Sequence, residues 1–116
     1  MKVIDRNSFI DTFQYFDKEI VVEIIDIFIN EYSERMESLK KDIDTLDFNA
    51  LKFDAHSMKG VIANFVAPRP QQLAKELEIK GTDKDASDLN RIYAELLIAG
   101  ADLVDDLKTL RPDFTA

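Results

Sequence analysis

Apolar side chains recur at steps of three and four residues along most of the chain, which is the spacing of one face of an α-helix. Asp5 or Asn7 can cap a short first helix, which is expected to bury three aromatic side chains, Phe9, Phe13 and Phe16. Asp17 can cap a second, long helix. The apolar stripe of that helix consists of Ile25, Phe28, Tyr32, Met36, Leu39, Ile43 and Leu46.

The second half of the chain predicts three more helices. One starts at the Asp47-Phe48-Asn49 turn, and its stripe consists of Phe48, Leu51, Ala55, Met58, Ile62 and Phe65. It ends before Pro68, because a residue that precedes proline is pushed out of helical geometry. A short fourth helix holds Leu73 and Leu77 and is expected to end by Gly81. The last helix begins around Asp85 to Ser87, and its stripe consists of Leu89, Tyr93, Leu96, Gly100, Leu103, Leu107 and Leu110.

These elements predict an all-α protein: an up-and-down antiparallel four-helix bundle with a short extra N-terminal helix across one end. A chain of 116 residues is expected to form a single domain over residues 1–116. Gly100 lies on the buried seam of the last helix, so we interpret it as a position of close packing. The first helix is expected to cover the widened start of the long stripe, which consists of Ile20, Val21, Ile24 and Ile27.

Composition narrows the possible functions. The net charge of −8 and the scattered basic residues argue against nucleic-acid binding. The absence of cysteine excludes disulfides, thiolate metal sites and cysteine nucleophiles. No apolar run is long enough to span a membrane, and the N-terminus lacks the pattern of a signal peptide, so we expect a cytoplasmic protein. We expect no metal site and no cofactor in this protein. We expect a monomer, because the outward faces are mostly charged.

The single histidine, His56, lies roughly 130° from the centre of the apolar stripe of its helix, so it faces outward. On the same face the helical phase places Lys52, Phe53, Lys59, Gly60, Ala63 and Asn64. Three of these neighbours need an explanation. Lys59 lies beside the imidazole, where a second cation would disfavour protonation of the ring. Gly60 lies in the interior of the predicted helix, where glycine is destabilising and no turn requires it. Phe53 is a large apolar side chain that points away from the core.

Phosphoryl chemistry would account for this patch. A neutral imidazole nitrogen can attack phosphorus and hold the phosphoryl group through a labile bond. Gly60 would leave room for that group, Lys59 would offset its charge, and Phe53 and Ala63 would form an apolar rim for a docking protein. Each feature also has an ordinary interpretation: a solvated histidine, a glycine that relieves helix packing, or a surface lysine. Their combination at this spacing favours the phosphoryl hypothesis.

The stretch from Ala55 to Phe65, AHSMKGVIANF, resembles the signature of histidine phosphotransfer (HPt) domains, commonly A-H-x-L-K-G followed by small residues. The resemblance extends through nearly the whole chain. The N-terminal half of the family is matched by Phe13, Phe16, Ile25, Phe28, Leu39 and Asp47, and its fourth helix by Leu73, Leu77 and Glu78.

The resemblance implies a role for several residues. His56 matches the phosphorylated histidine, Lys59 the lysine that helps to neutralise the phosphoryl group, and Gly60 the glycine that leaves room for it. Glu78 falls where the family usually has Gln or Glu, which hydrogen-bonds the other imidazole nitrogen and fixes the tautomer. The phase of Glu78 agrees, although a solvated surface acid is an equally good interpretation. The expected partner-binding residues are Lys52, Phe53, Ala63 and Asn64.

Four positions depart from the family pattern. Met58 replaces the usual Leu, which conserves volume in the core. Val61 and Ile62 are bulkier than the usual small pair. Val66 stands where the family often has a helix-ending glycine, and a β-branched residue resists the left-handed conformation of a glycine cap. We therefore expect Pro68 and Pro70 to shape this turn differently.

The resemblance implies phosphorelay signalling, in which the aspartyl phosphate of a receiver domain donates to His56 and another response regulator then accepts the group. The expected partners are receiver domains and a hybrid sensor histidine kinase, and the required Mg²⁺ would belong to the receiver. The chain has no phosphate loop and no kinase motif, so we expect a covalent carrier without autokinase activity. Two alternatives stay open: a phosphorylatable or docking domain cut from a larger hybrid or chemotaxis-type sensor kinase, and a receiver-binding bundle that is never phosphorylated. Because the chain starts with Met and ends soon after its last helix, we favour a free-standing protein.

Overall fold

The computed structural model describes residues 2–115, and within them the protein forms five α-helices, one short 3₁₀-helix and no strand. The helices are α1 (Arg6–Phe13), α2 (Lys18–Asp44), α3 (Phe48–Ala63), α4 (Pro68–Asp83) and α5 (Leu89–Leu110), followed by η1 (Arg111–Phe114). The expected all-α class is therefore confirmed. The two end residues of the predicted domain, Met1 and Ala116, lie outside the described residues.

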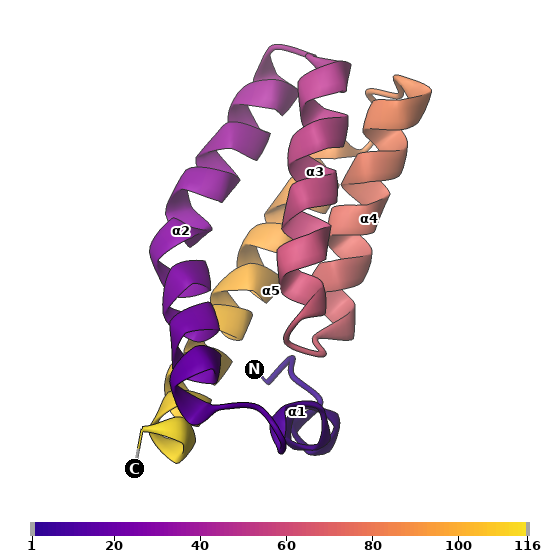
Figure 1. The fold of residues 1–116 in the computed structure, drawn as a ribbon. Helices are drawn as coiled ribbons and strands as arrows, with labels where there is room; N and C mark the ends of the chain where they lie inside the picture. Colours follow the sequence, from indigo (N-terminus) through magenta and orange to yellow (C-terminus); the bar gives the residue numbers. More distant parts are fainter. Residues whose placement is uncertain (1, 116) are drawn as a thin grey trace.

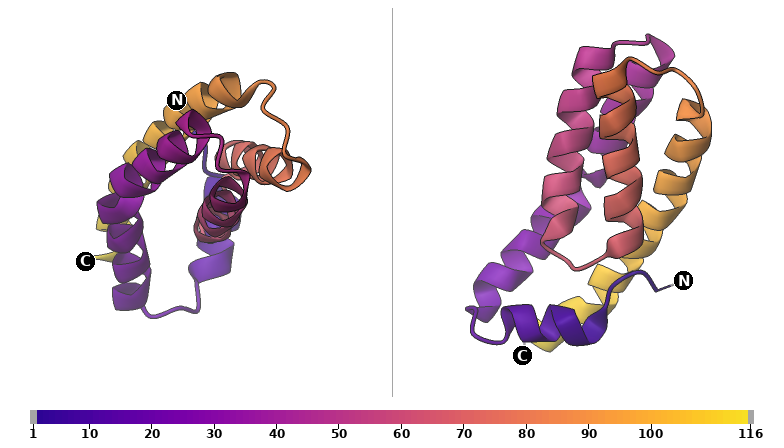
Figure 2. Two further views of the ribbon diagram at one scale, coloured as in Figure 1. Left: turned by 90° about the horizontal axis from the view of Figure 1, so that it is seen from above. Right: turned by 90° about the vertical axis from the view of Figure 1, so that its right-hand side faces the viewer.

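The four long helices lie side by side, and α1 lies across one end of them (Figure 1 and Figure 2). Each long helix contacts the next one in the chain, and α5 also contacts α2. The resulting body is elongated, with extents of 45 × 21 × 20 Å. Asp5 and Asp17 cap α1 and α2 as predicted, since their side chains accept hydrogen bonds from the backbone N–H groups of Ser8 and Glu19. Within residues 2–115, no helix combines the length and the apolar character needed to cross a membrane.

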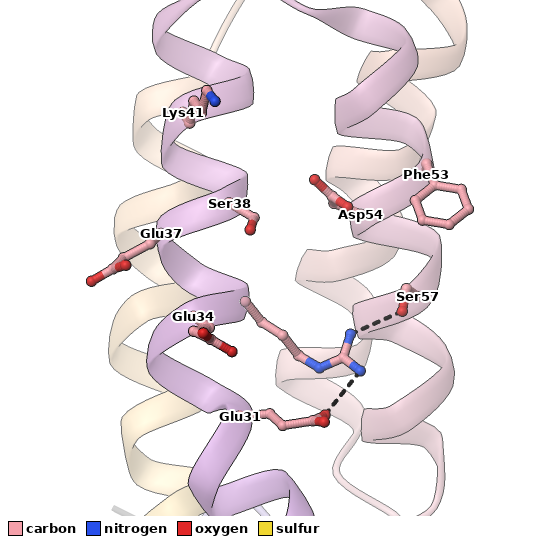
Figure 3. Close-up of a pocket in the computed structure, with 9 residues that line it drawn as sticks. Glu31, Glu34, Glu37, Ser38, Lys41, Phe53, Asp54 and Ser57 are labelled. Atoms are coloured by element: carbon pink, nitrogen blue, oxygen red, sulfur yellow. Dashed lines mark hydrogen bonds and ion pairs between the residues drawn. The ribbon is translucent and has the colours of Figure 1, made fainter.

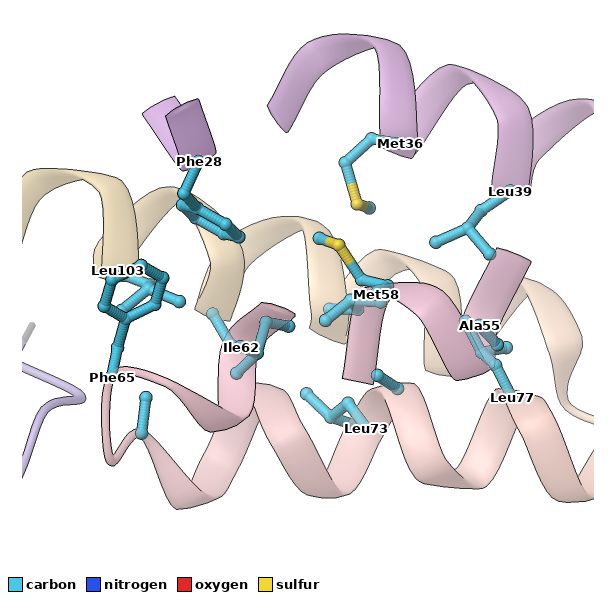
Figure 4. Packing of buried hydrophobic residues seen from close by; sticks show 14 of the residues in the cluster. Phe28, Met36, Leu39, Ala55, Met58, Ile62, Phe65, Leu73, Leu77 and Leu103 are labelled. Atoms are coloured by element: carbon cyan, nitrogen blue, oxygen red, sulfur yellow. The ribbon is translucent and has the colours of Figure 1, made fainter. Parts of the chain in front are cut away.

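One apolar core runs between the four long helices, and it follows most of the predicted stripes (Figure 4). Met58, which replaces the usual Leu, is completely buried, as expected for a volume-conserving exchange. The core also includes positions outside the predicted stripes, namely Ala67, Pro70, Ala74, Ile92 and Ala99. Ala67 has a non-helical backbone before Pro68, so α3 and α4 are separated as predicted.

The predictions for α1 and its contact with α2 are partly wrong. Phe9 and Phe13 are buried, and the Phe9 ring centroid lies 5.9 Å from that of Phe114, but Phe16 is 50% exposed. Because α1 crosses the end of the bundle and does not lie along α2, it leaves Ile20 and Ile27 about half exposed. Leu46 is also exposed, since α2 ends at Asp44 and the backbone at Leu46 turns into the left-handed region.

The predicted ends of α4 and α5 are wrong as well. Gly81 does not end α4, because the helix continues to Asp83 and Lys84 adopts the left-handed cap. The last helix begins at Leu89 and not at Asp85 to Ser87. The reason is local: the Asp85 carboxylate accepts hydrogen bonds from the N–H of Ser87 and from Lys80, which folds this segment into a turn.

Val66 adopts the left-handed backbone conformation that its β-branched side chain was expected to resist, with φ of 53°. The N-terminal segment helps to hold this turn. The N–H of Asp5 donates a hydrogen bond to the carbonyl of Val66, at 2.9 Å. The preceding N–H groups, of Val3 and Ile4, donate to the buried carboxylate of Asp106 on α5. The N-terminal segment thus ties α5 to the α3–α4 turn, and it stabilises a turn that usually needs glycine.

The three glycines lie inside helices but have different surroundings. A Cβ built on Gly81 would lie 2.7 Å from the backbone nitrogen of Lys52, so α4 packs directly on the backbone of α3. A Cβ on Gly100 would lie 2.7 Å from the ring of Tyr32, which confirms the expected close packing on the last helix. A Cβ on Gly60 would meet nothing within 4 Å. Packing therefore explains Gly81 and Gly100, but not Gly60.

This contrast predicts opposite effects for the same substitution. Gly81→Ala should lower the free energy of unfolding by about 1–3 kcal/mol, because backbone atoms of α3 cannot move away cheaply. Gly60→Ala should raise it by up to about 1 kcal/mol, because alanine is the better helix former and the space is open. Urea denaturation of both variants measures the two effects. Equal destabilisation by both would contradict the close contact of α3 with α4 at Gly81.

Candidate functional site

His56 lies near the middle of α3 on the outward face, and its side chain is 69% exposed. The neighbouring residues predicted from helical phase are brought together as expected. Lys52, Phe53, Gly60, Ala63 and Asn64 are exposed on this helix or at its end, and Phe53 is 74% exposed. The imidazole is therefore open to approach by another molecule, with a large apolar side chain one turn before it.

The neighbouring helix α4 supplies a carboxylate that joins His56 to Lys59. One oxygen of Glu78, Oε2, lies 2.5 Å from Nδ1 of His56, and the other, Oε1, accepts a hydrogen bond from Nζ of Lys59 at 2.6 Å. The side chain of Glu78 is only 19% exposed. Of the two interpretations of Glu78, contact with the histidine is therefore the one that the geometry supports.

The glycine contact between the two helices explains why this carboxylate reaches the histidine. Gly81 lies three residues after Glu78 on α4, and Lys52 lies four residues before His56 on α3. The place where α4 touches the backbone of α3 is thus about one helical turn from the Glu78–His56 contact. A side chain at position 81 would push the helices apart, and the short side chain of Glu78 would then lose its contact.

The charge of Glu78 determines the tautomer of His56. The hydrogen bond from Lys59, followed by that from His56, lowers the pKa of the Glu78 carboxyl, so this group is ionised at neutral pH. An ionised carboxylate only accepts hydrogen bonds, so Nδ1 of His56 must carry the proton. Nε2 then keeps its lone pair, and it has no hydrogen-bond partner among the described residues. The exposed nitrogen is therefore the nucleophilic one.

Gly60 leaves open space beside this ring. It follows His56 by one turn and is exposed, and a side chain there would be directed into solvent and not into another part of the protein. The helical phase places Gly60 on the side of His56 that faces α2, while Lys59 lies on the side that faces α4. The ring is thus bordered by a cation on one side and by free space on the other.

An open cleft of about 670 Å³ lies between α2 and α3 on the open side of this site (Figure 3). Arg35 of α2 crosses it and donates hydrogen bonds to Oγ of Ser57 at 2.9 Å and to Glu31 at 3.2 Å. Sequence reasoning missed Arg35, because its contact with Ser57 depends on how two helices pack and no spacing in the chain reveals it. Across residues 2–115, no three histidine or carboxylate side chains converge as metal ligands.

Comparison with known proteins agrees with this geometry. The site defines a class of helical proteins that present one histidine, with its tautomer fixed, on the outside of a bundle. The family model for the Hpt domain matches residues 23–111, so the chain belongs to the Hpt domain family. Its function is accordingly histidine phosphotransfer in phosphorelay signalling, and members of the family are generally carriers of phosphoryl groups and not enzymes. Their partners in phosphorelays are response-regulator receiver domains and kinases.

A solved structure has the same fold. Histidine-containing phosphotransfer protein B (HptB) from Pseudomonas aeruginosa PAO1 is 23% identical, and the match covers 96% of both chains with a TM-score of 0.85. A comparison with curated proteins gives no significant match.

The Glu78 contact predicts a measurable tautomer. At a pH where the ring is neutral, ¹⁵N NMR should show His56 with its proton on Nδ1. Glu78→Ala should shift the ring toward the Nε2–H form, because the acceptor at Nδ1 is lost. Glu76→Ala, on the same helix, is the matched control and should leave the tautomer unchanged. An unchanged tautomer in Glu78→Ala would show that the carboxylate does not orient the ring.

Proposed function

We propose that Nε2 of His56 is the atom that accepts and donates the phosphoryl group. The observation that carries this proposal is the contact of Glu78 with Nδ1, which leaves the nucleophilic lone pair on the exposed nitrogen. His56 is the only histidine of the chain, so no other imidazole competes for the role.

The transfer step exchanges one bond for another. The lone pair of Nε2 attacks phosphorus of the receiver's aspartyl phosphate, an N–P bond forms, and the P–O bond to the aspartate breaks, which releases the aspartate as a carboxylate. The ring becomes positively charged as the N–P bond forms, and the anionic Glu78 next to Nδ1–H stabilises that charge. In the reverse direction the same contact holds the ring while another receiver's aspartate accepts the group.

Lys59 and Gly60 serve the phosphoryl group itself. Lys59 is 28% exposed and is held next to the ring by Glu78, so it offsets part of the negative charge of the transferred group. Gly60 leaves room for the phosphoryl oxygens on the side of α2. The Mg²⁺ ion that receiver chemistry requires belongs to the receiver in this proposal, and the protein itself holds no cofactor.

The docking surface for the receiver extends from His56 along α3 and α2. Phe53, Lys52, Ala63 and Asn64 surround the histidine, and an apolar groove of about 170 Å³ begins next to Asn64. It is lined by Ile24, Ile27, Phe28, Glu31, Val61, Asn64 and Phe65. Asn64 lies about 12 Å along α3 from His56, so a receiver that brings its aspartate to Nε2 also covers this groove. The half-exposed Ile27 then becomes buried against the receiver.

The proposal also covers the arrangement of the helices and the place of the protein in the relay. The four long helices form an up-and-down antiparallel bundle, supported by the contacts of each helix with the next and of α5 with α2. Residues 1–116 act as one domain, monomeric and cytoplasmic, that carries phosphoryl groups without autokinase activity. It receives the group from the receiver domain of a hybrid sensor kinase and passes it to a response regulator.

Phosphoryl transfer tests the proposal directly. Incubation with a phosphorylated receiver domain should place an acid-labile label on the protein, and His56→Gln should take up none. The same variant should still bind the receiver, since glutamine keeps the fold. Label on His56→Gln would contradict the assignment of His56. Full biological activity of this variant would instead favour a bundle that only docks the receiver.

Gly60→Gln probes the open space without removing the nucleophile. The fold should remain at least as stable, because glutamine is a good helix former, while transfer should slow at least tenfold because the side chain occupies the space of the phosphoryl oxygens. Single-turnover transfer rates measure this, with Gly60→Ala as the control of smaller volume. Equal transfer rates for Gly60→Gln and the wild type would show that the phosphoryl group does not need open space at this position.

The docking surface predicts a loss of receiver affinity in Ile27→Asp. The charge would be buried against the receiver, so the dissociation constant should rise about tenfold or more. Isothermal titration calorimetry measures it. Ile98→Asp is the control, because Ile98 is the same exposed residue type (65% exposed, against 49% for Ile27) but lies on α5 outside the groove. Equal effects of both variants would place the receiver elsewhere.

A further inference from the structure

Two carboxyl groups meet inside the α2–α3 interface, and the transfer chemistry uses neither of them. Asp42, in the last turn of α2, is only 7% exposed, and its Oδ2 is fully buried without a hydrogen-bond donor among the described residues. The carboxyl group of Asp54, which is partly buried in α3 and points toward α2 (Figure 3), lies within hydrogen-bonding reach of the Asp42 carboxyl. Two ionised carboxylates have no donor between them, so this contact requires a proton.

The surroundings of Asp42 favour the protonated form. Burial, followed by the Asp54 carboxyl and the charge of Asp47 at the start of α3, raises the pKa of Asp42 to about 7, against a smaller opposing effect of Lys41 on α2. The position of Asp42 near the C-terminus of α2 acts in the same direction, because the helix dipole disfavours negative charge there.

We propose that Asp42 and Asp54 share one proton across the α2–α3 interface, and that release of this proton to solvent as the pH rises loosens α2 from α3 beside His56. In the protonated state one carboxyl donates its O–H to the other, and the two helices are joined. After the proton leaves, two carboxylates face each other in a poorly solvated place and repel.

The position of the pair connects it to the transfer site, and this step rests on the proposed function. Asp54 precedes His56 by two residues on α3, and it lines the same cleft as Arg35 and Ser57. The receiver surface spans α2 and α3, so a change in how these helices pack alters the surface that the receiver contacts. Docking of the receiver should therefore weaken above neutral pH.

The sign of the effect on stability follows from proton binding. The folded protein binds this proton more tightly than the unfolded chain, in which the pKa of Asp42 has its ordinary value of 3.8. The stabilisation is therefore complete at pH values below the unfolded pKa and is lost as the pH rises through about 7. Between pH 5.5 and 8, a pKa of about 7 corresponds to a fall of roughly thirtyfold in the equilibrium constant for folding.

The first test is a carboxyl ¹³C NMR titration of the unphosphorylated protein. The Asp42 carboxyl should titrate with a pKa of about 7 and not at its ordinary value of 3.8. In Asp42→Asn this titration near neutral pH should disappear, because the amide donates permanently to Asp54. Titration of Asp42 near its ordinary pKa of 3.8 in the wild type would overturn the proposal.

Urea denaturation between pH 5.5 and 8 is the second test. The folding equilibrium constant of the wild type should fall by at least tenfold over this range, and that of Asp42→Asn should fall much less. The control is Glu37→Gln, which removes an exposed charge from the same helix and the same cleft and should keep the pH dependence of the wild type. If Asp42→Asn does not fold, Asp54→Asn replaces it. An unchanged pH dependence in the folded Asn variant would overturn the shared proton.

The effect of the Asp42–Asp54 pair on the transfer site is tested separately, by the pH dependence of receiver affinity. Receiver affinity should fall between pH 6.5 and 8 in the wild type more than in Asp42→Asn, measured with one receiver under both conditions. Equal pH dependence in the two proteins would overturn the coupling to the transfer site and leave the shared proton in place. Failure of all phosphoryl transfer would instead contradict the proposed function, and the carboxyl titration would still decide the question of the shared proton.

Discussion

The site depends on one carboxylate that holds two side chains at once. Glu78 binds Nδ1 of His56 with one oxygen and Nζ of Lys59 with the other, so it sets the ring tautomer and holds the cation next to it. Its own charge is maintained by these two partners. Without this bridge the imidazole would be an ordinary solvated side chain, free to rotate and to carry its proton on either nitrogen. The fold contributes to the chemistry chiefly by bringing this carboxylate to α3.

That placement depends in turn on how closely two helices approach. Gly81 allows α4 to rest on the backbone of α3 one turn away from the bridge, while Gly60 keeps the space on the other side of the ring open. The two glycines therefore serve opposite purposes, contact and clearance, although both lie inside a continuous helix. Gly81 is required by the packing of the fold, whereas Gly60 is required by the transferred phosphoryl group. Substitutions at the two positions therefore test packing and transfer separately.

Much of the site around His56 could be predicted from the sequence, because helical phase is a local property of the chain. Phase along a single helix places His56 on the outside next to Lys59 and Gly60, because the helical repeat alone determines which residues share a face. The exposure of Phe53 follows from the same repeat. The family signature adds Glu78, since phase alone could not tell a ring partner from a solvated acid.

Features that arise between helices could not be predicted in this way. The role of Gly81 depends on the distance between α3 and α4, and the exposure of Ile27 depends on α1 crossing the end of the bundle and not running along α2. Val66 takes a left-handed conformation in a turn that the distant N-terminal segment helps to hold, through a hydrogen bond to the Val66 carbonyl. The pairing of Asp42 with Asp54 likewise needs two helices in register. In each case the deciding contact joins residues that are far apart in the chain or lie on different helices, so no local pattern reveals it.

The most direct test of the account is the identity of the phosphorylated nitrogen. Long-range ¹H–¹⁵N NMR of the phosphorylated protein distinguishes the two isomers of phosphohistidine, and the single histidine makes the assignment unambiguous. The Glu78 bridge predicts that phosphorus is bound to Nε2 and that Nδ1 keeps its proton. Phosphorus bound to Nδ1 would contradict the account, because that nitrogen would then have to leave the carboxylate on which the whole arrangement rests.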